Sequence, residues 1–151
     1  YKWALCRKIM HDINSLYKTF KSIDKGNEKK WSKSFFISLV KLESTICLFS
    51  KPEKKGYLIA RVLKDEIEII ALLVDISYRR TGLAKYLLEE LKKIAKQRHA
   101  CKIILEVSIL NKSAIALYKN KGFVELATRK NYYIIKNKRV DAKIMCLNLS
   151  E

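Results

Sequence analysis

The middle of the chain constrains the fold most, because two strand-like stretches there enclose one strongly periodic stretch. Residues 66–75 (EIEIIALLVD) and 101–109 (CKIILEVSI) are dense in aliphatic residues, which is typical of strands. Between them, residues 82–98 carry leucine, isoleucine and alanine side chains at helical intervals. This strand–helix–strand order predicts a crossover connection inside a mixed α/β domain.

The flanking segments add further helices and strands. Helices are predicted over residues 8–22, 31–41 and 111–122, with Ser32 and Asn111 as caps, and strands over residues 44–50, 57–63, 123–135 and 140–149. The run from Ile69 to Val74 is apolar at every position, as expected for a central strand buried on both faces. The chain has 151 residues and no Pro/Gly-rich linker, so residues 1–151 are expected to form a single domain.

The chain is strongly basic, with a formal net charge of +17. An excess of that size attracts anions over a Debye length of roughly 8–10 Å. A nucleic acid, the ribosome, an acidic membrane or a phosphorylated cofactor would all respond to it. Lysine greatly outnumbers arginine, however, and the lysines are spread along the chain. A bias in genome composition is therefore the alternative to a selected partner surface.

Other features of the sequence argue against several classes of protein. No apolar run reaches the roughly 18 residues of a membrane span, and no signal-peptide pattern is visible. Cys6, Cys47, Cys101 and Cys146 are spaced too widely for a zinc site. We therefore expect reduced thiols in the core, no metal, no membrane partner and a cytoplasmic location.

A candidate anion site follows the first central strand, in the segment YRRTGLA (residues 78–84). The first N–H groups of a helix have no internal acceptor, and the helix dipole places positive charge there. Gly82 has no Cβ, so a phosphate could approach its backbone, and Arg79, Arg80 and Lys85 add charge. The spacing is neither that of a P-loop nor GxGxxG. The alternative is a plain turn with solvated arginines.

One carboxylate lies inside a strand that the sheet should largely bury. Glu106 shares a strand face with Ile104 and Ser108. Burying an unpaired carboxylate costs several kcal/mol, so Glu106 should have a partner, keep contact with water or bind a proton. Such a group is suited to general-base chemistry. The alternative is a residue at the sheet end that faces solvent or pairs with a lysine.

Tyr118, on the helix that follows this strand, is a third candidate. A buried phenol normally has a hydrogen-bond partner and can give its proton to a stronger base. The neighbouring Ile115 and Leu117 also allow a purely packing role.

Taken together, residues 69–149 resemble the GNAT acetyltransferase superfamily. Its pattern Q/R-x-x-G-x-G/A is matched by Arg79, Gly82 and Ala84. The segments LLVDISYRRTGLAKYLLEEL, LEVSILNKSAIALYKNKGF, RKNYYI and DAKIM are similar to the bacterial ribosomal-protein alanine N-acetyltransferase (RimI) family, as is WSKSFF. The resemblance implies a single GNAT-type domain of the α/β (α+β) class, with a mixed, mostly antiparallel sheet of about six to seven strands flanked by helices.

The resemblance also implies acetyl-CoA as co-substrate and no metal. Glu106 matches the general base of the family and Tyr118 its general acid. Tyr132 and Tyr133 match positions near the substrate peptide. The implied cofactor-binding positions are Leu72, Leu73, Val74, Arg79, Arg80, Thr81, Gly82, Leu83, Ala84, Lys85 and Asn111.

The implied function is acetylation of a protein N-terminus, above all the N-terminal alanine of a small-subunit ribosomal protein, with association to the ribosome through the basic surface. One alternative is a GNAT enzyme that acts on another amine, such as a lysine side chain or a polyamine. The other is a basic RNA- or ribosome-binding module, which predicts salt-steep RNA binding without acetyl-CoA. No RNA-recognition motif is visible, so specific nucleic-acid recognition is not expected.

Overall fold

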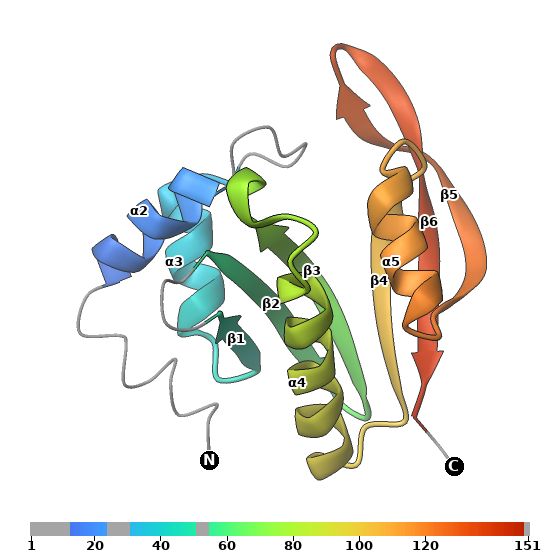
Figure 1. The fold of residues 1–151 in the computed structure, drawn as a ribbon, viewed down its shortest axis with the longest axis horizontal. Coiled ribbons are helices and arrows are strands. Elements are labelled where there is room, and N and C mark those ends of the chain that lie inside the picture. Colours follow the sequence, from blue (N-terminus) through green and yellow to red (C-terminus); the bar gives the residue numbers. More distant parts are fainter. Residues whose placement is uncertain (1–12, 24–30, 51–54, 150–151) are drawn as a thin grey trace.

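The structure is a computed structural model that describes residues 13–23, 31–50 and 55–149 (Figure 1). The helices are α2 (Ile13–Ile23), α3 (Lys33–Lys41), α4 (Leu83–Gln97) and α5 (Lys112–Asn120), and a 3-10 turn, η2 (Ile76–Tyr78), precedes α4. The strands are β1 (Thr45–Phe49), β2 (Gly56–Leu63), β3 (Glu66–Val74), β4 (Lys102–Ser108), β5 (Val124–Ile135) and β6 (Lys138–Asn148). The predicted elements are present with small shifts at their ends, and residues 8–12 of the first predicted helix lie outside the described ranges.

Within the described residues, six strands form one sheet in the order β1-β2-β3-β4-β6-β5. β3 and β4 are parallel and are connected through α4, whereas all other neighbouring strands are antiparallel. The predicted crossover and the predicted fold class, a mixed and mostly antiparallel sheet flanked by helices, are confirmed.

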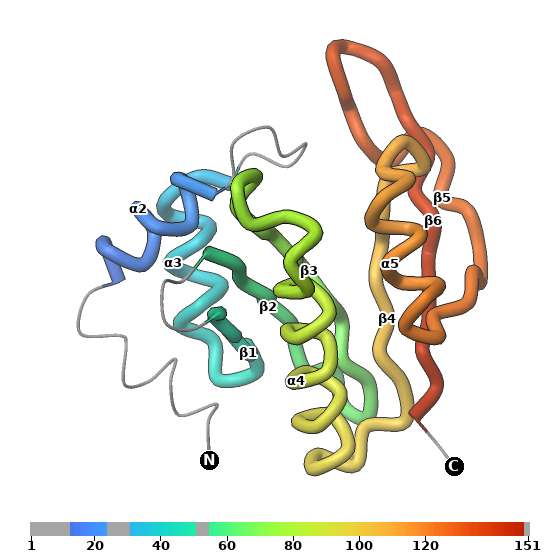
Figure 2. Tube along the Cα trace, in the orientation of Figure 1, coloured from blue at the N-terminus to red at the C-terminus, as the bar shows by residue number. Residues whose placement is uncertain are grey.

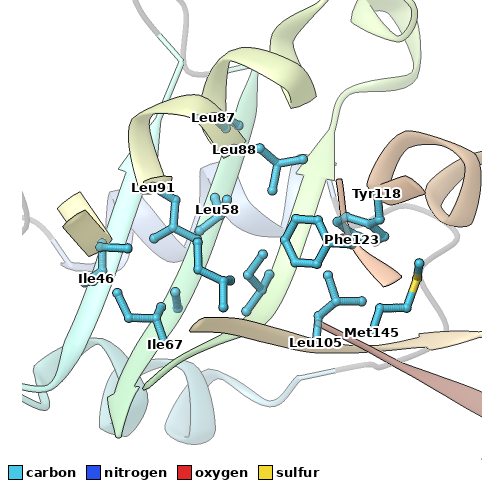
Figure 3. Close-up of a cluster of buried hydrophobic side chains, with 14 of the residues drawn as sticks. Ile46, Leu58, Ile67, Leu87, Leu88, Leu91, Leu105, Tyr118, Phe123 and Met145 are labelled. Atoms are coloured by element: carbon cyan, nitrogen blue, oxygen red, sulfur yellow. The ribbon is translucent and has the colours of Figure 1, made fainter. Parts of the chain in front are cut away.

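Two apolar cores lie on opposite faces of the first half of the sheet. Neighbouring residues of a strand point to opposite faces, and Leu58 and Ile59 of β2 accordingly belong to different cores. The first core lies under α4 and α5 and continues into β4 and β6 through Leu105 and Met145 (Figure 3). The second core lies under α2 and α3 and includes no described residue of β4, β5 or β6. One face of the β4–β6–β5 half of the sheet is therefore outside both cores.

A β-bulge in β3 marks the place where the sheet opens. The register between β2 and β3 skips Ile70, an extra residue between Ile69 and Ala71. The bulge reverses the alternation of side chains, since Ile69 joins the first core and Ile70 and Ala71 both join the second. The pairing of β3 with β4 also ends here, at Ile69 opposite Leu105, and the two strands then diverge (Figure 2).

The prediction that the strand from Ile69 to Val74 is buried on both faces is wrong for its second part. Residues 70–74 are all only partly buried. Because β4 diverges after the bulge, this part of β3 keeps β2 as a neighbour on one side only, and Ile70 to Leu73 border an opening on the other side. An apolar run shows that a strand avoids water, but it does not show whether the neighbour is protein or a ligand.

Two of the predicted helix caps are confirmed. The hydroxyl of Ser32 accepts a hydrogen bond from the N–H of Phe35 at 3.1 Å. The side-chain oxygen of Asn111 accepts one from the N–H of Ala114 at 3.2 Å. Both bonds satisfy N–H groups that have no acceptor inside their own helix.

The prediction that the cysteines are buried is only partly confirmed. Cys47 and Cys146 are buried, whereas Cys101 is exposed just before β4, and Cys6 lies outside the described residues. The Sγ atom of Cys101 lies 3.2 Å from the backbone oxygen of Asp65, in the turn between β2 and β3. The described part of the chain contains no cluster of residues that could hold a metal ion. None of its helices is long and apolar enough to cross a membrane.

Candidate active site

A cleft opens between β3 and β4 where their pairing ends. Past Ile69 and Leu105 the two strands are not paired with each other, so their facing backbone groups remain for a ligand. Strands, α5 and the far part of β5 all contribute to its walls. Among the predicted site residues, those that line it are Leu72, Leu73, Glu106, Asn111, Tyr118 and Tyr133.

The turn before α4 leaves the N-terminus of that helix uncapped. Gly82 is the N-cap residue, with φ 92°, and no side chain caps it. The first helical bond runs from the N–H of Tyr86 to the oxygen of Gly82 at 2.9 Å, so the N–H groups of Leu83, Ala84 and Lys85 have no acceptor in the helix. A Cβ added to Gly82 would meet no atom within 4 Å. The backbone conformation at Gly82 favours glycine, and the space beside its Cα is open.

The residues ahead of Gly82 shape this turn. Arg80 has a left-handed backbone with φ 67°. The hydroxyl of Thr81 donates to the oxygen of Tyr78 at 2.6 Å. The Nε of Arg79 donates to the oxygen of Val74 at 3.3 Å and so ties the turn to the end of β3. Arg79 therefore has a structural contact, in addition to the charge that it brings near the helix N-terminus.

Glu106 has the partner that its place in the sheet requires. The Nη1 of Arg129 lies 2.7 Å from the Oε1 of Glu106, and the two side chains are 55% and 19% exposed, respectively. The bond to Glu106 raises the pKa of Arg129, and a hydrogen bond to the same carboxylate raises the pKa of Tyr132. The hydroxyl of Tyr133 donates to the backbone oxygen of Glu106 at 3.3 Å. The partner is thus an arginine, not the lysine that the sequence suggested as one alternative.

A second bulge, in β5, brings these partners to one carboxylate. Between Arg129 and Tyr133 the register of β5 with β6 shifts, so three residues lie opposite the single Asp141. Asn131 has φ 56°, and its N–H donates to the Oδ1 of Asp141 at 2.8 Å. The guanidinium of Arg129 lies 4.3 Å from the ring centroid of Tyr132. In a regular strand, neighbouring side chains alternate between the two faces of the sheet. The bulge in β5 interrupts this alternation, so that Arg129 and Tyr132 can both reach Glu106.

Tyr118 both packs in the core and lines the cleft. Its side chain is 6% exposed, and its ring centroid lies 5.5 Å from that of Phe123, within the first core (Figure 3). Burial raises the pKa of Tyr118. The phenol therefore keeps its proton at neutral pH and can act only as a proton donor there.

The carboxylate and the phenol reach the cleft from opposite faces of the sheet. Tyr118 belongs to the core under α4 and α5, together with Leu105. Glu106 follows Leu105 in β4, so its side chain points to the other face. The cleft lies where the sheet plane is interrupted, and both side chains border it. A proton acceptor and a proton donor thus flank one opening.

Other predicted positions lie around this cleft. Val74 ends β3, Tyr132 contacts Glu106, and residues 79–85 form the turn that leads into α4. Asn111 reaches the cleft while its side chain caps α5.

Two residues of the site could not be assigned from the sequence. Arg129 was one basic residue among many, and its partner depends on the bulge. Trp31 lines the cleft, and its ring stacks on Phe20 with centroids 5.2 Å apart. Its segment WSKSFF is similar to a known family, but nothing in the segment itself places Trp31 beside β3 and β4.

Comparison with known proteins identifies the fold. A sequence model of the acetyltransferase (GNAT) family matches residues 9–123. The ribosomal protein bS18-alanine N-acetyltransferase of Escherichia coli strain K12 is 40% identical over 95 residues, which cover 63% of this chain and 64% of that protein. The matched part is thus less than two thirds of that relative.

Solved structures extend the similarity over most of the chain. The crystal structure of the ribosomal-protein-S18-alanine N-acetyltransferase from Escherichia coli has a TM-score of 0.81 at 32% identity, covering 93% of this chain and 90% of that chain. Arabidopsis thaliana NAA60, solved in complex with acetyl-CoA, has a TM-score of 0.76 at 21% identity over 91% of this chain and 93% of its own, and shares the fold. The chain belongs to the acetyltransferase (GNAT) family.

Proposed function

We propose that this protein transfers an acetyl group from acetyl-CoA to the α-amino group of a protein N-terminus, and that the acceptor is the N-terminal alanine of a small-subunit ribosomal protein. The observation that carries the proposal is the position of Glu106 and Tyr118, which border one cleft from opposite faces of the sheet. Similarity to ribosomal protein bS18-alanine N-acetyltransferases supports the choice of acceptor.

The residues around the cleft fit a CoA thioester. The uncapped N-terminus of α4, with Arg80 and Lys85 beside it, suits a diphosphate. The unpaired edge of β3 at Leu72, Leu73 and Val74 suits an amide-containing arm, which can hydrogen-bond to a strand edge. Asn111 borders the same cleft. Acetyl-CoA would supply an acetyl carbonyl that is already activated for attack by an amine.

Glu106 is the proposed general base. An N-terminal ammonium group cannot attack a carbonyl carbon until it loses a proton, and Glu106 can accept that proton directly or through water. Arg129 holds Oε1 of this carboxylate at 2.7 Å. An incoming ammonium group would therefore share the carboxylate with Arg129 or displace it, which the exposed arginine side chain allows.

Tyr118 is the proposed general acid. Its raised pKa keeps the hydroxyl protonated at neutral pH. As the carbon–sulfur bond breaks, the phenol can donate its proton to the departing sulfur, and the tyrosinate regains a proton from solvent through the cleft. The N–H groups of β3 beyond its bulge could stabilise negative charge that develops on the acetyl oxygen.

The acceptor would enter on the face that carries Glu106. Tyr132, Tyr133 and Trp31 give this entrance an aromatic border. Aromatic side chains provide contact area for a peptide at little cost in conformational entropy. A protein N-terminus is therefore favoured over a small polyamine.

The test is an acetylation assay with two matched peptides. One peptide begins with a free alanine and contains no lysine, and the other has a blocked N-terminus and one internal lysine. Release of the CoA thiol with the first peptide alone is the expected result. Turnover with the second peptide alone would indicate a lysine acetyltransferase, and turnover with neither would contradict the proposal.

A further inference from the structure

The β5–β6 hairpin extends past the sheet as a two-stranded arm, residues 130–140 (Figure 1). The pairing of β4 with β6 ends at Ser108 opposite Ala142. Beyond that pair, β5 and β6 continue together through Tyr133 opposite Val140 to Ile135 opposite Lys138. This part of the hairpin has no third strand beside it among the described residues, so both of its edges are free, and residues 136–139 at its tip are exposed.

The arm carries positive charge without internal compensation. Lys130, Lys136, Lys138 and Arg139 are all exposed, and no acidic residue occurs between positions 130 and 140. None of the four forms an ion pair with another described residue. Two lysines of α4 differ, since Lys92 pairs with Glu89 at 3.6 Å and Lys93 pairs with Glu90 at 2.7 Å.

The cations of the arm lie on both of its faces. Lys138 pairs with Ile135 and Arg139 pairs with Ile134, and neighbouring positions of a strand point in opposite directions. A flat membrane surface would contact only one of these faces. A ribbon with cations on both faces can contact phosphates on two sides at once, as the folded backbone of an RNA presents them.

We propose that the β5–β6 arm docks onto the phosphate backbone of RNA and so holds an RNA-bound acceptor at the active site. The same hairpin carries Arg129, which contacts Glu106. Lys138 and Ala142, the partner of Arg129, are four positions apart in β6. At about 3.4 Å per residue, the basic tip lies within about 15 Å of that end of the active site.

This inference rests on the proposed function, because a ribosomal acceptor protein is associated with RNA. Docking of this kind does not require the arm to read a base sequence. Contacts from lysine and arginine to phosphates position a protein on RNA without specifying sequence. The arm would therefore increase the local concentration of the enzyme near its acceptor.

The test compares two variants that each lose three positive charges. The arm variant is Lys136→Gln/Lys138→Gln/Arg139→Gln. The control variant is Lys33→Gln/Lys41→Gln/Lys96→Gln, whose exposed lysines lie on α3 and α4. Binding to a short RNA hairpin is measured by fluorescence anisotropy at several salt concentrations. Anionic phosphatidylglycerol vesicles and polyglutamate serve as the competing partners.

We expect the wild-type protein and the control variant to bind the RNA with a similar dependence on salt. The arm variant should bind more weakly, and the slope of log K against log salt should become shallower by about 2–3 units, one contact for each lost cation. Equal slopes for both variants would overturn the proposal. So would arm-dependent binding to the vesicles or to polyglutamate without arm-dependent binding to RNA.

Acetylation of the free alanine peptide provides the second measurement. The arm variant should retain the kcat and KM of the wild-type protein for that peptide, because none of its three substitutions touches the cleft. A wild-type protein that binds RNA through the arm but acetylates no α-amine would contradict the proposed function alone. Loss of peptide turnover in the arm variant would show that the arm belongs to the peptide site and would overturn the docking role.

Discussion

The two halves of the sheet bury their strands differently. In β2, Leu58 and Ile59 are both buried, one in each apolar core. In β4, Leu105 is buried in the core under α4 and α5, whereas its neighbour Glu106 lies on a face outside both cores and keeps 19% exposure. The first half of the sheet thus has two covered faces, and the second half has one.

This difference explains where polar chemistry can exist in the domain. A charged side chain at Leu58 or Ile59, the buried positions of β2, would have no partner and would cost several kcal/mol. Arg61, nearer the end of β2, is 41% exposed and pairs with Glu68. On the uncovered face of β4, Glu106 has Arg129 as its ion-pair partner and keeps access to solvent. The bulge in β3 lies at the boundary between the halves, and the cleft opens there.

The largest expected effect of a single substitution is on catalysis, in the half with one covered face. Glu106→Gln keeps the shape of the side chain but removes the proton acceptor, so kcat should fall by about 10²–10⁴-fold. The measurement is kcat with the alanine peptide across the neutral pH range. Glu68→Gln is the matched control, because Glu68 lies on the same face and pairs with Arg61 at 2.8 Å instead. A Glu106→Gln variant with wild-type kcat would show that Glu106 is not the base.

The next effect is on stability, in the half with two covered faces. Leu58 is fully buried, so Leu58→Ala should lower the free energy of unfolding by about 2–5 kcal/mol. Ile104 lies on the face of β4 that carries Glu106 and is only partly buried, so Ile104→Ala should cost about 1 kcal/mol. Urea unfolding of both variants measures the difference. Equal losses would mean that both halves of the sheet are covered to the same degree.

Alanine substitutions at two glycines separate the effect of backbone strain on stability from the effect on acetyl-CoA binding. Gly82 and Gly122 have φ of 92° and 90°, so alanine at either position should cost roughly 1–2 kcal/mol of stability. Gly82 precedes the uncapped N-terminus of α4, whereas Gly122 follows α5 and a Cβ there would meet Leu147 at 3.3 Å. Only Gly82→Ala should also raise the KM for acetyl-CoA. A similar rise in Gly122→Ala would mean that strain alone weakens binding.

The sequence was sufficient to predict most of the fold, because its signals are local. Alternation, helical spacing and capping residues such as Ser32 and Asn111 determine the elements, and the crossover determines the parallel pair. The prediction failed for the second part of β3, where burial depends on a neighbour that diverges. Composition cannot reveal that divergence, since Ile70 is as apolar as the residues beside it.

The site was predictable only where a residue was unusual for its place. Glu106 stood out as a carboxylate in an apolar strand, and Gly82 as a glycine before a helix. Arg129 did not stand out, since the chain has 32 lysines and arginines. Its contact with Glu106 depends on the bulge in β5, which the hydrogen bond from Asn131 to Asp141 holds. The alternation of polar and apolar residues along a strand does not predict such a shift in register.

The smallest expected effect concerns Tyr118, which connects the covered face of the sheet to the cleft. Burial raises the pKa of Tyr118 above its usual value of 10.0. The folded protein therefore retains this proton at a pH where the unfolded chain has begun to lose it. Well below pH 10 both states keep this proton, and the group has no effect on the pH dependence of stability.

As the pH rises above that value, the unfolded state releases the proton first, so the free energy of unfolding should fall by up to about 1.4 kcal/mol per pH unit. Tyr118→Phe has no such proton and should lack this part of the decline. Urea unfolding of the wild-type protein and of Tyr118→Phe, below and above pH 10, measures the difference. Tyr86→Phe is the control, because the side chain of Tyr86 is 48% exposed on the surface of α4. Parallel curves for the wild-type protein and Tyr118→Phe would mean that the phenol is hydrated, and that the covered face of the sheet admits water at the cleft.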